Sequence, residues 1–319
     1  MTTVKRFRFG VLAESVQSAG AFVNTARRAE DAGFATFLMR DHFVEEPFGH
    51  QFAPFTALAT VASVTKRLRV GSLVFSNDYR HPLLLAKEAA TLDVLSGGRL
   101  ELGLGTGFES REYEQTGFSR DSPSVRAERL GEGVQIIKKA FAGEPFTFTG
   151  AYYSVTDFKS FPPSLQRPHP PLLIGGGRGQ LLSIAAKEAD IVGLQMSSTA
   201  HGVHSNPARL RLAETVMEKV RLLQKTAGDR FGDLELSVVA TIRLTRHRVT
   251  AAEQLATERN WTELSPQRVL AMPSVLIGSA EEITDEIRRR RELYAISYYV
   301  VSDRSMDAVA PIVNRLSGQ

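Results

Sequence analysis

The sequence predicts an α/β fold, a closed (β/α)8 TIM barrel that forms one domain over residues 1–319 with loop insertions. Short β-rich runs alternate along the chain with longer segments that have helical spacing, and eight such runs can be counted. No linker, low-complexity tract or internal repeat divides the chain, and its 319 residues suit a single barrel. An open, doubly wound sheet is the alternative that the same alternation allows.

The predicted strands are short runs rich in leucine, β-branched and aromatic residues. In chain order they are 7–12, 36–39, 68–75, 99–105, 171–176, 189–194, 234–242 and 296–301. Two segments interrupt the alternation. Residues 146–155 alternate around a glycine, which predicts a small hairpin before the fifth strand, and residues 195–206 form a polar loop after the sixth.

Helices are predicted where apolar residues recur every three or four positions. The first of them has Phe22, Ala26 and Ala29 on one face and ends at Gly33. Two others begin with proline, which suits the first turn of a helix. The main predicted helices are 19–33, 54–65, 82–96, 122–141 and 306–316.

Composition and charge narrow the class of protein. Basic residues exceed acidic ones by 39 − 35 = 4, a surplus too small and too dispersed to indicate nucleic-acid binding. The arginines at 288–291 follow acidic residues, an order that suits the dipole of a solvated helix end. The chain has no cysteine, which excludes disulfides, thiolate metal sites and a cysteine nucleophile. Residues 1–30 carry acids and no long apolar run, and no segment could span a bilayer, so we expect a cytoplasmic enzyme.

Polar residues follow the second predicted strand at the end of a barrel where active sites lie. Asp41 and His42 come directly after this strand. An acid and an imidazole at this position suit acid–base catalysis. The alternative is structural, with Asp41 capping a loop and His42 exposed to solvent.

A glycine-rich run follows the fifth predicted strand and leads into a helix. Glycines let the backbone approach a ligand closely, and a helix N-terminus favours an anion, so the run is a candidate phosphate seat. It comprises Gly175, Gly176, Gly177 and Arg178. Gln180 stands where a dinucleotide fingerprint needs its third glycine, and the glycines could also serve only to turn strand into helix. We predict no metal site, because His201 and His204 alone have a ligand-like spacing.

Four long segments together resemble the bacterial luciferase-like superfamily of flavin and deazaflavin oxidoreductases. The four segments are 33–43, 80–108, 169–194 and 275–287. The first contains the run RDHF, the second ends in LELGLGTGF, and the third contains PLLIGGGRGQ. The resemblance implies a (β/α)8 barrel and therefore argues against the open sheet. Since members of this superfamily are commonly dimers, it also implies a homodimer.

Asp-His-Phe after the second strand is similar to the branch that uses the deazaflavin coenzyme F420, whereas FMN branches often have Glu-His-His. The resemblance implies that Asp41 lies against the deazaflavin ring and that His42 donates or accepts a proton. Hydride transfer at F420 leaves a proton to be moved separately, which an imidazole can do near neutral pH.

The resemblance also implies a seat for the cofactor. A non-proline cis peptide between Leu73 and Val74 would press against the ring. Thr106, Gly107 and the backbone of 175–177 would hold the ribityl chain and phosphate. Basic groups near the barrel mouth would suit the anionic tail of F420, and the candidates are Arg40, Arg80, Arg111 and Arg178.

Two departures argue against glucose 6-phosphate as the substrate. Phe108 stands where the sugar-phosphate dehydrogenase branch has Glu, and the Trp expected after Asp-His-Phe is missing. Phe43, Phe48, Phe52 and Phe108 indicate an apolar pocket, and core packing is the alternative explanation for each of them. We therefore expect an F420-dependent oxidoreductase acting on an uncharged or apolar organic substrate. The alternatives are an FMN-dependent monooxygenase supplied with reduced flavin by a separate reductase, and a non-catalytic flavin-binding barrel.

Overall fold

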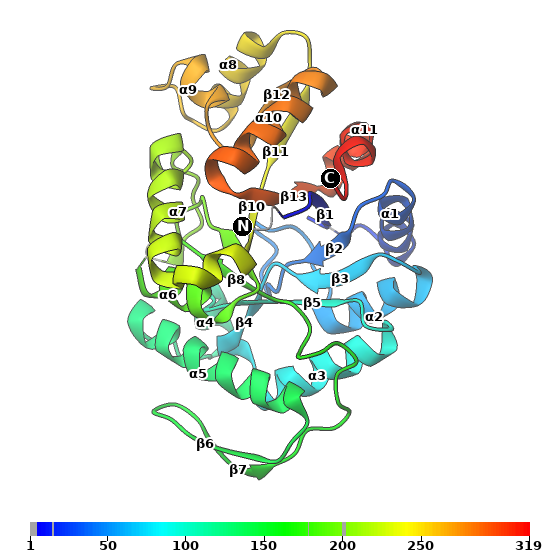
Figure 1. Ribbon diagram of the computed structural model, residues 1–319, viewed down its shortest axis with the longest axis vertical. Helices are drawn as coiled ribbons and strands as arrows, with labels where there is room; N and C mark the ends of the chain where they lie inside the picture. The colour runs from blue at the N-terminus through cyan, green and yellow to red at the C-terminus, as the bar shows by residue number, and fades with distance from the viewer. Residues whose placement is uncertain (1–4, 15, 178, 200–201) are drawn as a thin grey trace.

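The computed structural model describes residues 5–14, 16–177, 179–199 and 202–319. Parallel strands form a barrel with helices around it (Figure 1). They are β1 (Arg8–Leu12), β2 (Thr36–Met39), β3 (Arg69–Ser72), β4 (Phe75–Ser76), β5 (Leu100–Gly105), β8 (Leu172–Gly176), β9 (Ile191–Leu194), β10 (Glu235–Val239) and β13 (Ile296–Ser302). Because β4 continues β3, the nine strands occupy 9 − 1 = 8 positions. The sheet closes where Val70 of β3 pairs with Leu100 of β5, which confirms the predicted barrel and excludes the open sheet.

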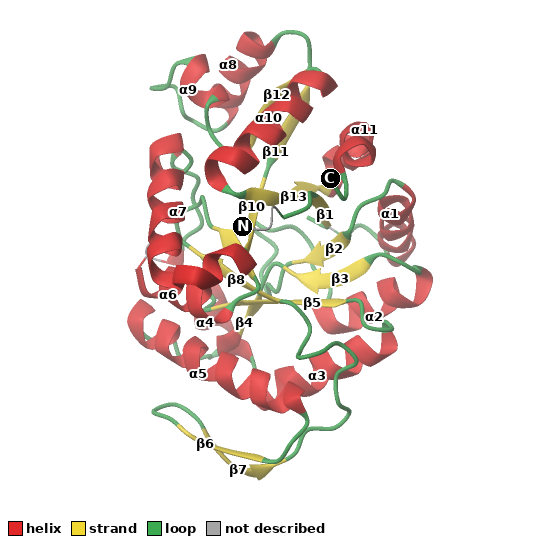
Figure 2. Cartoon of the chain, viewed as in Figure 1, coloured by secondary structure: helices red, strands yellow, loops and turns green. Residues whose placement is uncertain are grey.

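Helices cover the outside of the barrel (Figure 2). They are α1 (Ala19–Asp31), α2 (Pro54–Val64), α3 (Pro82–Leu95), α4 (Ser110–Thr116), α5 (Pro123–Ala142), α6 (Gly179–Glu188), α7 (Ala213–Ala227), α8 (Arg248–Glu258), α9 (Pro266–Leu270), α10 (Ala280–Tyr294) and α11 (Met306–Leu316). Local sequence sets several of their starts. The Ser18 and Ser122 hydroxyls accept hydrogen bonds from first-turn N–H groups, and Ser279 with Glu282 forms a capping box.

Two predicted strands prove to be broken. The run 68–75 is interrupted at Leu73 and Val74, whose peptide bond is cis, as the family resemblance implied. The run 234–242 is interrupted at Ala240. Beyond it, β11 (Thr241–Leu244) leaves the barrel and pairs with β12 (Val275–Gly278), a strand that the sequence analysis did not identify. A continuous apolar run does not show where its backbone leaves one sheet for another, so the break at Ala240 was invisible in the sequence.

The insertions lie outside the barrel. The hairpin predicted at 146–155 is present as β6 (Phe146–Thr149) and β7 (Ser154–Phe158), which pair antiparallel at the bottom of Figure 1. The loop after β5 contains α4, a helix of 7 residues, which the sequence analysis treated as loop. So short a helix shows too little apolar periodicity to be recognised.

Two apolar layers stabilise the barrel. The larger one lies between the strands and the surrounding helices, and Phe37, Val61 and Leu85 belong to it. The smaller one fills the barrel interior and consists of Leu12, Leu38, Leu173, Ile191, Tyr298 and Val300, with Leu73 and Val74 packed against it. The barrel is therefore a packed core rather than a pore.

The prediction of a solvated arginine run at 288–291 is wrong for one residue. Arg290 is 1% exposed, and its guanidinium donates to the Pro273 and Leu270 carbonyls and to Glu286. Four consecutive helical residues point in different directions, so one of them faces the protein.

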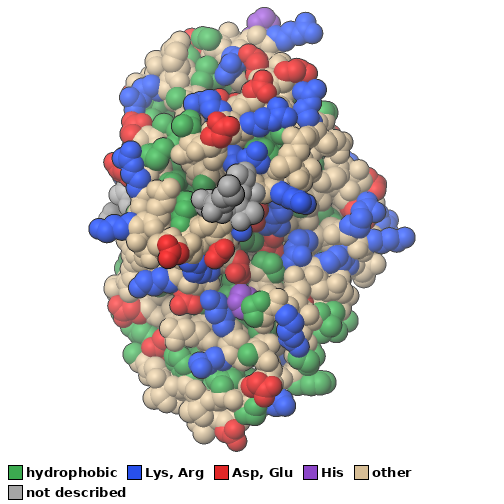
Figure 3. Space-filling model, in the orientation of Figure 1, with side chains coloured by type: hydrophobic (Ala, Val, Ile, Leu, Met, Phe, Trp, Pro, Cys, Tyr) green, Lys and Arg blue, Asp and Glu red, His purple; other side chains and the backbone are tan. Residues whose placement is uncertain are grey.

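Over the face shown in Figure 3, basic and acidic side chains are interspersed. None of the described helices is long and apolar enough to cross a membrane.

Candidate active site

The barrel leaves open space beside Gly175 at its mouth, meaning the C-terminal ends of the strands. Leu173 on β8 belongs to the interior layer, but a Cβ added at Gly175 would meet no heavy atom within 4 Å beyond its chain neighbours. On β5, a Cβ at Gly105 would lie 2.5 Å from Val74 Cγ2. Gly105 thus admits the Val74 side chain, and Gly175 leaves open space.

Asp41 is held by Arg80 rather than by His42. Its carboxylate is 6% exposed and accepts two hydrogen bonds from the Arg80 guanidinium, at 2.5 and 3.0 Å. It also accepts one from the Ser76 backbone N–H at 3.0 Å. Asp41 therefore ties the end of β2 to the chain just beyond Val74. Within the described residues it makes no hydrogen bond to His42, so a different acid orients the imidazole.

That acid is Glu112, on α4 after the fourth barrel position. Both of its carboxylate oxygens lie 3.1 Å from His42 Nδ1. The same carboxylate accepts hydrogen bonds from the Phe43 backbone N–H and from the Tyr79 hydroxyl, each at 2.5 Å. Glu112 is 0% exposed, so these partners replace the water that an ionised carboxylate would otherwise need.

The hydrogen bonds determine the charge of Glu112. Burial by itself would raise the pKa of this carboxyl, but the hydrogen bonds from His42 and Tyr79, the His42 charge and the Phe43 N–H lower it below its ordinary value. Burial and the same carboxylate raise the pKa of the Tyr79 hydroxyl, which keeps it a donor.

The ionised carboxylate in turn fixes the His42 tautomer. A carboxylate only accepts hydrogen bonds, so Nδ1 carries a proton. Nε2 has no hydrogen-bond partner among the described residues, and the side chain is 13% exposed. His42 is thus arranged to exchange a proton at Nε2.

Aromatic rings enclose His42. The Phe48 ring stacks on the imidazole with centroids 3.5 Å apart and planes 4° apart, and Phe108 meets both rings edge-on. The His204 ring lies 6.2 Å from Phe48 and 6.3 Å from Phe108. Phe48 and Phe108 thus place apolar surface against the imidazole and limit the access of water.

The other two phenylalanines expected in the pocket lie elsewhere, which corrects that prediction. Phe43 is 58% exposed and contacts Tyr79 and Phe118, while Phe52 is 42% exposed and contacts Phe22. Neighbouring loop residues point to different sides, and their order in the sequence does not show which side faces the mouth.

The expected phosphate and ribityl residues lie at the ends of β5 and β8. Thr106 and Gly107 follow β5, and Gly107 has a φ of 71°. A Cβ there would lie 2.5 Å from Ser76 Oγ, a buried hydroxyl with no hydrogen-bond partner among the described residues. An unpaired buried hydroxyl beside this glycine fits a polar group of a bound cofactor. At the other strand end, Gly175 and Gly176 close β8, Gly177 follows, and Arg178 lies outside the described residues.

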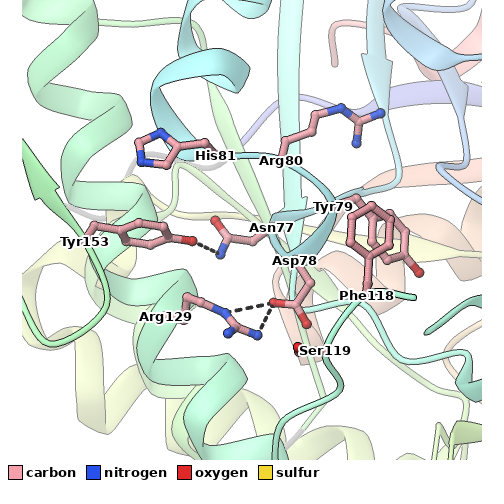
Figure 4. A pocket seen from close by; sticks show the side chains of 9 residues that line it. All are labelled: Asn77, Asp78, Tyr79, Arg80, His81, Phe118, Ser119, Arg129 and Tyr153. Atoms are coloured by element: carbon pink, nitrogen blue, oxygen red, sulfur yellow. Dashed lines mark hydrogen bonds and ion pairs between the residues drawn. The ribbon is translucent and has the colours of Figure 1, made fainter. Parts of the chain in front are cut away.

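A separate cleft lies on the other side of Tyr79 (Figure 4), lined by the 3-10 turn η1 (Asn77–Tyr79), α5 and the hairpin. Its polar side chains pair with one another. Arg129 lies 2.8 Å from Asp78, and Asn77 Nδ2 donates to the Tyr153 hydroxyl at 3.1 Å. Tyr79 links the two sites, since its ring stacks on Phe118 while its hydroxyl supports Glu112.

Glu112 is the functional residue that the sequence analysis missed. The loop after β5 contains the acids Glu109, Glu112 and Glu114 within a few residues, and their spacing does not show which one faces His42. Only the turn of α4 decides this. His204 had been considered solely as a metal ligand, and no group of three or more His, Asp or Glu side chains that could hold a metal ion exists within the described residues.

Comparison with known proteins gives a consistent family. The model of the luciferase-like monooxygenase family matches residues 2–297. The oxygenase component of a flavin-dependent trigonelline monooxygenase from Acinetobacter baylyi is 29% identical over 192 residues, 60% of this chain and 49% of that protein. An F420-dependent hydroxymycolic acid dehydrogenase from Mycobacterium tuberculosis is 32% identical over 172 residues, 52% of this chain and 46% of that protein. The chain thus spans about half the length of these relatives.

Solved structures share the whole fold. An F420-dependent secondary alcohol dehydrogenase in complex with an F420–acetone adduct has a TM-score of 0.76 at 17% identity, covering 98% of this chain and 99% of that one. An EDTA monooxygenase from Chelativorans sp. has a TM-score of 0.76 at 15% identity, covering 99% and 95%. Proteins named for dehydrogenation and for monooxygenation therefore share this barrel, and the fold alone does not separate the two activities.

Proposed function

The chain belongs to the luciferase-like monooxygenase family, and from that premise we propose that it is a coenzyme F420-dependent oxidoreductase acting on a small organic substrate. The observation that carries the proposal is the His42–Glu112 pair, formed by residues that follow β2 and β5 at the mouth of the barrel. Relatives named as F420-dependent support the choice of cofactor, as does Asp-His-Phe at the end of β2.

Bound F420 supplies a carbon that gives or takes a hydride. The residues of this chain handle the accompanying proton. His42, held at Nδ1 by Glu112, transfers the proton between Nε2 and the substrate. Phe48 and Phe108 accommodate the apolar part of the substrate and keep water from the proton-transfer site.

The cofactor residues follow from the same arrangement. Leu73 and Val74 would support the ring, and residues at and after the ends of β5 and β8 would hold the ribityl chain and phosphate. These are Thr106, Gly107, Gly175, Gly176, Gly177 and Arg178. Asp41 acts through Arg80 and Ser76 as a positioning residue, because its carboxylate is already occupied by them. A homodimer remains a prediction from the family resemblance, and a cytoplasmic location remains a prediction from the sequence.

The second candidate is an FMN-dependent monooxygenase that receives reduced flavin from a separate reductase. The trigonelline relative, named as an oxygenase component, favours it. FMN and F420 share a ring shape and a ribityl phosphate, so the seat at Gly175–Gly177 suits both. A non-catalytic flavin-binding barrel is the third candidate, and under it His42 would be dispensable.

Titration of both cofactors into the cofactor-free protein, followed by fluorescence at low and high salt, tests this choice. We expect F420 to bind more tightly than FMN. Its advantage should shrink as ionic strength rises, because its lactyl-oligoglutamate tail is anionic and salt screens exposed charge contacts, for which Arg40 and Arg111 are candidates. Tighter binding of FMN at every salt concentration would overturn the F420 assignment and favour the monooxygenase.

A further inference from the structure

Arg211, near the barrel mouth, carries a largely buried positive charge without an acidic partner. Its guanidinium donates to two neutral oxygens, Ser274 Oγ at 2.9 Å and Asn206 Oδ1 at 3.0 Å, and lies 5.7 Å from the Trp261 ring centroid. Its Nε is buried and has no hydrogen-bond partner among the described residues. Every Asp and Glu of the chain is described, and none forms an ion pair with Arg211.

Such a charge is costly for the protein to maintain. Burial, followed by the nearby Arg259, lowers the pKa of Arg211 to about 10. Buried charges are ordinarily paired, and an unpaired one destabilises the folded state. Removing Arg211 would therefore cost the empty protein little, so its presence calls for a bound anion that supplies the missing counter-charge.

The surroundings of Arg211 add to its positive potential. Burial lowers the pKa of His204, and the strongest charge effects in the same direction come from Arg40, Arg211, His42 and Arg259. These groups come from the loop after β2, the loop that follows β9 and the end of α8. Arg259 is exposed and forms no ion pair with any described residue. Because Glu14 pairs with Arg40 and Glu112 with His42, the uncompensated positive charges near His204 are those of Arg211 and Arg259, and these favour a bound anion.

The same histidine connects this charged region to the reaction site. The His204 ring packs against Phe48 and Phe108, and both of these rings contact His42. A ligand with its anionic end at Arg211 can therefore place an apolar part against the two phenylalanines, next to the proton-transferring imidazole.

We propose that Arg211 forms an anion subsite for the substrate, which is an organic molecule with an apolar reacting part and a carboxylate, sulfonate or phosphate at the other end. This replaces the expectation of an uncharged substrate, and its identification as substrate rests on the proposed function. The phosphate or oligoglutamate tail of the cofactor has the same anionic chemistry, so the experiment must separate the two sources.

Trp261 makes the subsite directly observable, since it is the only tryptophan in the chain. Its Nε1 donates to the Asn206 carbonyl at 2.7 Å, on the residue whose side chain holds Arg211. We would titrate cofactor-free protein with benzoate and with its neutral isostere benzamide while following tryptophan fluorescence. Benzoate should change the fluorescence saturably and raise the melting temperature, whereas benzamide should do neither. Equal responses to both compounds, or none to benzoate, would overturn the subsite.

Variants locate the charge that is responsible. Arg211→Gln should weaken benzoate binding by about 30-fold or more, the scale of losing one charged hydrogen-bonding partner, and Arg211→Lys should retain part of it. The matched control is Arg209→Gln, an exposed arginine two residues away, which should bind benzoate like the wild type. The melting temperature of Arg211→Gln without ligand should stay close to that of the wild type. A large fall would instead indicate a structural arginine and contradict the proposal.

The source of the anion is decided by adding the cofactor. If the subsite belongs to the substrate, protein saturated with F420 or FMN should bind benzoate as tightly as cofactor-free protein. If the cofactor alone changes the Trp261 fluorescence and displaces benzoate, the subsite holds a cofactor anion and the substrate assignment fails. Benzoate binding is measured without any cofactor, so its outcome does not depend on the outcome of the F420 titration. A failure of the anion subsite and a failure of the proposed cofactor can therefore be told apart.

Discussion

The two ends of the barrel both contain buried acids among basic groups, yet they use them differently. At the floor, meaning the N-terminal ends of the strands, Arg8 donates to Glu101 at 3.0 Å and to Glu235 at 2.9 and 2.5 Å. The Tyr298 hydroxyl donates to the other Glu101 oxygen at 3.0 Å. Although burial opposes it, the charges of Glu101 and Glu235 hold the pKa of Arg8 well above its ordinary value. The floor is thus a network whose charges compensate one another.

At the mouth the acids are satisfied, but two basic groups each keep an unpaired nitrogen. Asp41 is occupied by Arg80, and Glu112 by His42 and Tyr79. His42 Nε2 and Arg211 Nε, in contrast, have no hydrogen-bond partner within the described residues. Unsatisfied polar nitrogens cost stability, and these two lie at the end of the barrel where loops bind ligands. The comparison teaches that the floor serves stability, whereas the mouth leaves basic groups available for a ligand.

The largest expected effect concerns the floor. Glu101→Gln should lower the free energy of unfolding by about 3 kcal/mol, the lower end for breaking a buried ion pair, because Glu235 still compensates Arg8. Denaturant unfolding measures this change. Turnover per folded molecule should not change, and a fall comparable to that of a His42 variant would break the division between floor and mouth.

An exposed ion pair supplies the matched control for the floor. Glu258, whose side chain is 54% exposed, pairs with Arg243 at the surface. Water screens and solvates such a pair, so Glu258→Gln should change the free energy of unfolding by less than about 1 kcal/mol.

The next largest effect concerns the mouth. His42→Ala should lower turnover about 100-fold, equivalent to about 2.7 kcal/mol of barrier, because the proton at the substrate loses its carrier. Cofactor binding, measured by fluorescence titration, should persist. The control is His50→Ala, since His50 is a solvent-exposed histidine of the same loop, 67% exposed. Unchanged turnover in His42→Ala would favour the non-catalytic barrel, and loss of cofactor binding with normal residual chemistry would contradict the assigned role.

The smallest effect links the mouth to the neighbouring cleft. Glu112 has a lowered pKa when folded, so its contribution to stability is present above its unfolded pKa and is lost as pH falls through the folded pKa. Tyr79→Phe removes one donor and raises the folded pKa. The free energy of unfolding near pH 7 should fall by about 1.5 kcal/mol, and the loss in acid should begin at a higher pH.

Chemical denaturation across the acid range measures this shift. Tyr153→Phe is the control, because the Tyr153 hydroxyl accepts a hydrogen bond from the neutral amide of Asn77. Its loss should change stability without moving the acid transition. The same acid dependence in Tyr79→Phe and in wild type would show that the Tyr79 hydroxyl does not stabilise the Glu112 charge.

The sequence by itself determined the architecture. Apolar periodicity gave the order of strands and helices, since burying one face of each element is what the barrel requires. It also placed Asp41 and His42 at the mouth, because the residue after a parallel strand lies there whatever the loop does next. The motif around GSLVFS identified the interruption at Leu73–Val74 only through its resemblance to a family, not through propensity.

The tertiary structure decided which groups meet. Asp41 adjoins His42 in the chain, but successive residues at a strand end point to different sides, so Asp41 binds Arg80 while His42 binds Glu112, 70 residues away in sequence. That Arg211 lacks an acidic partner is also a property of the fold, because it depends on which residues the tertiary structure brings near the guanidinium. Composition and spacing carry no information about such long-range contacts. These contacts determine which groups at the barrel mouth are available for chemistry.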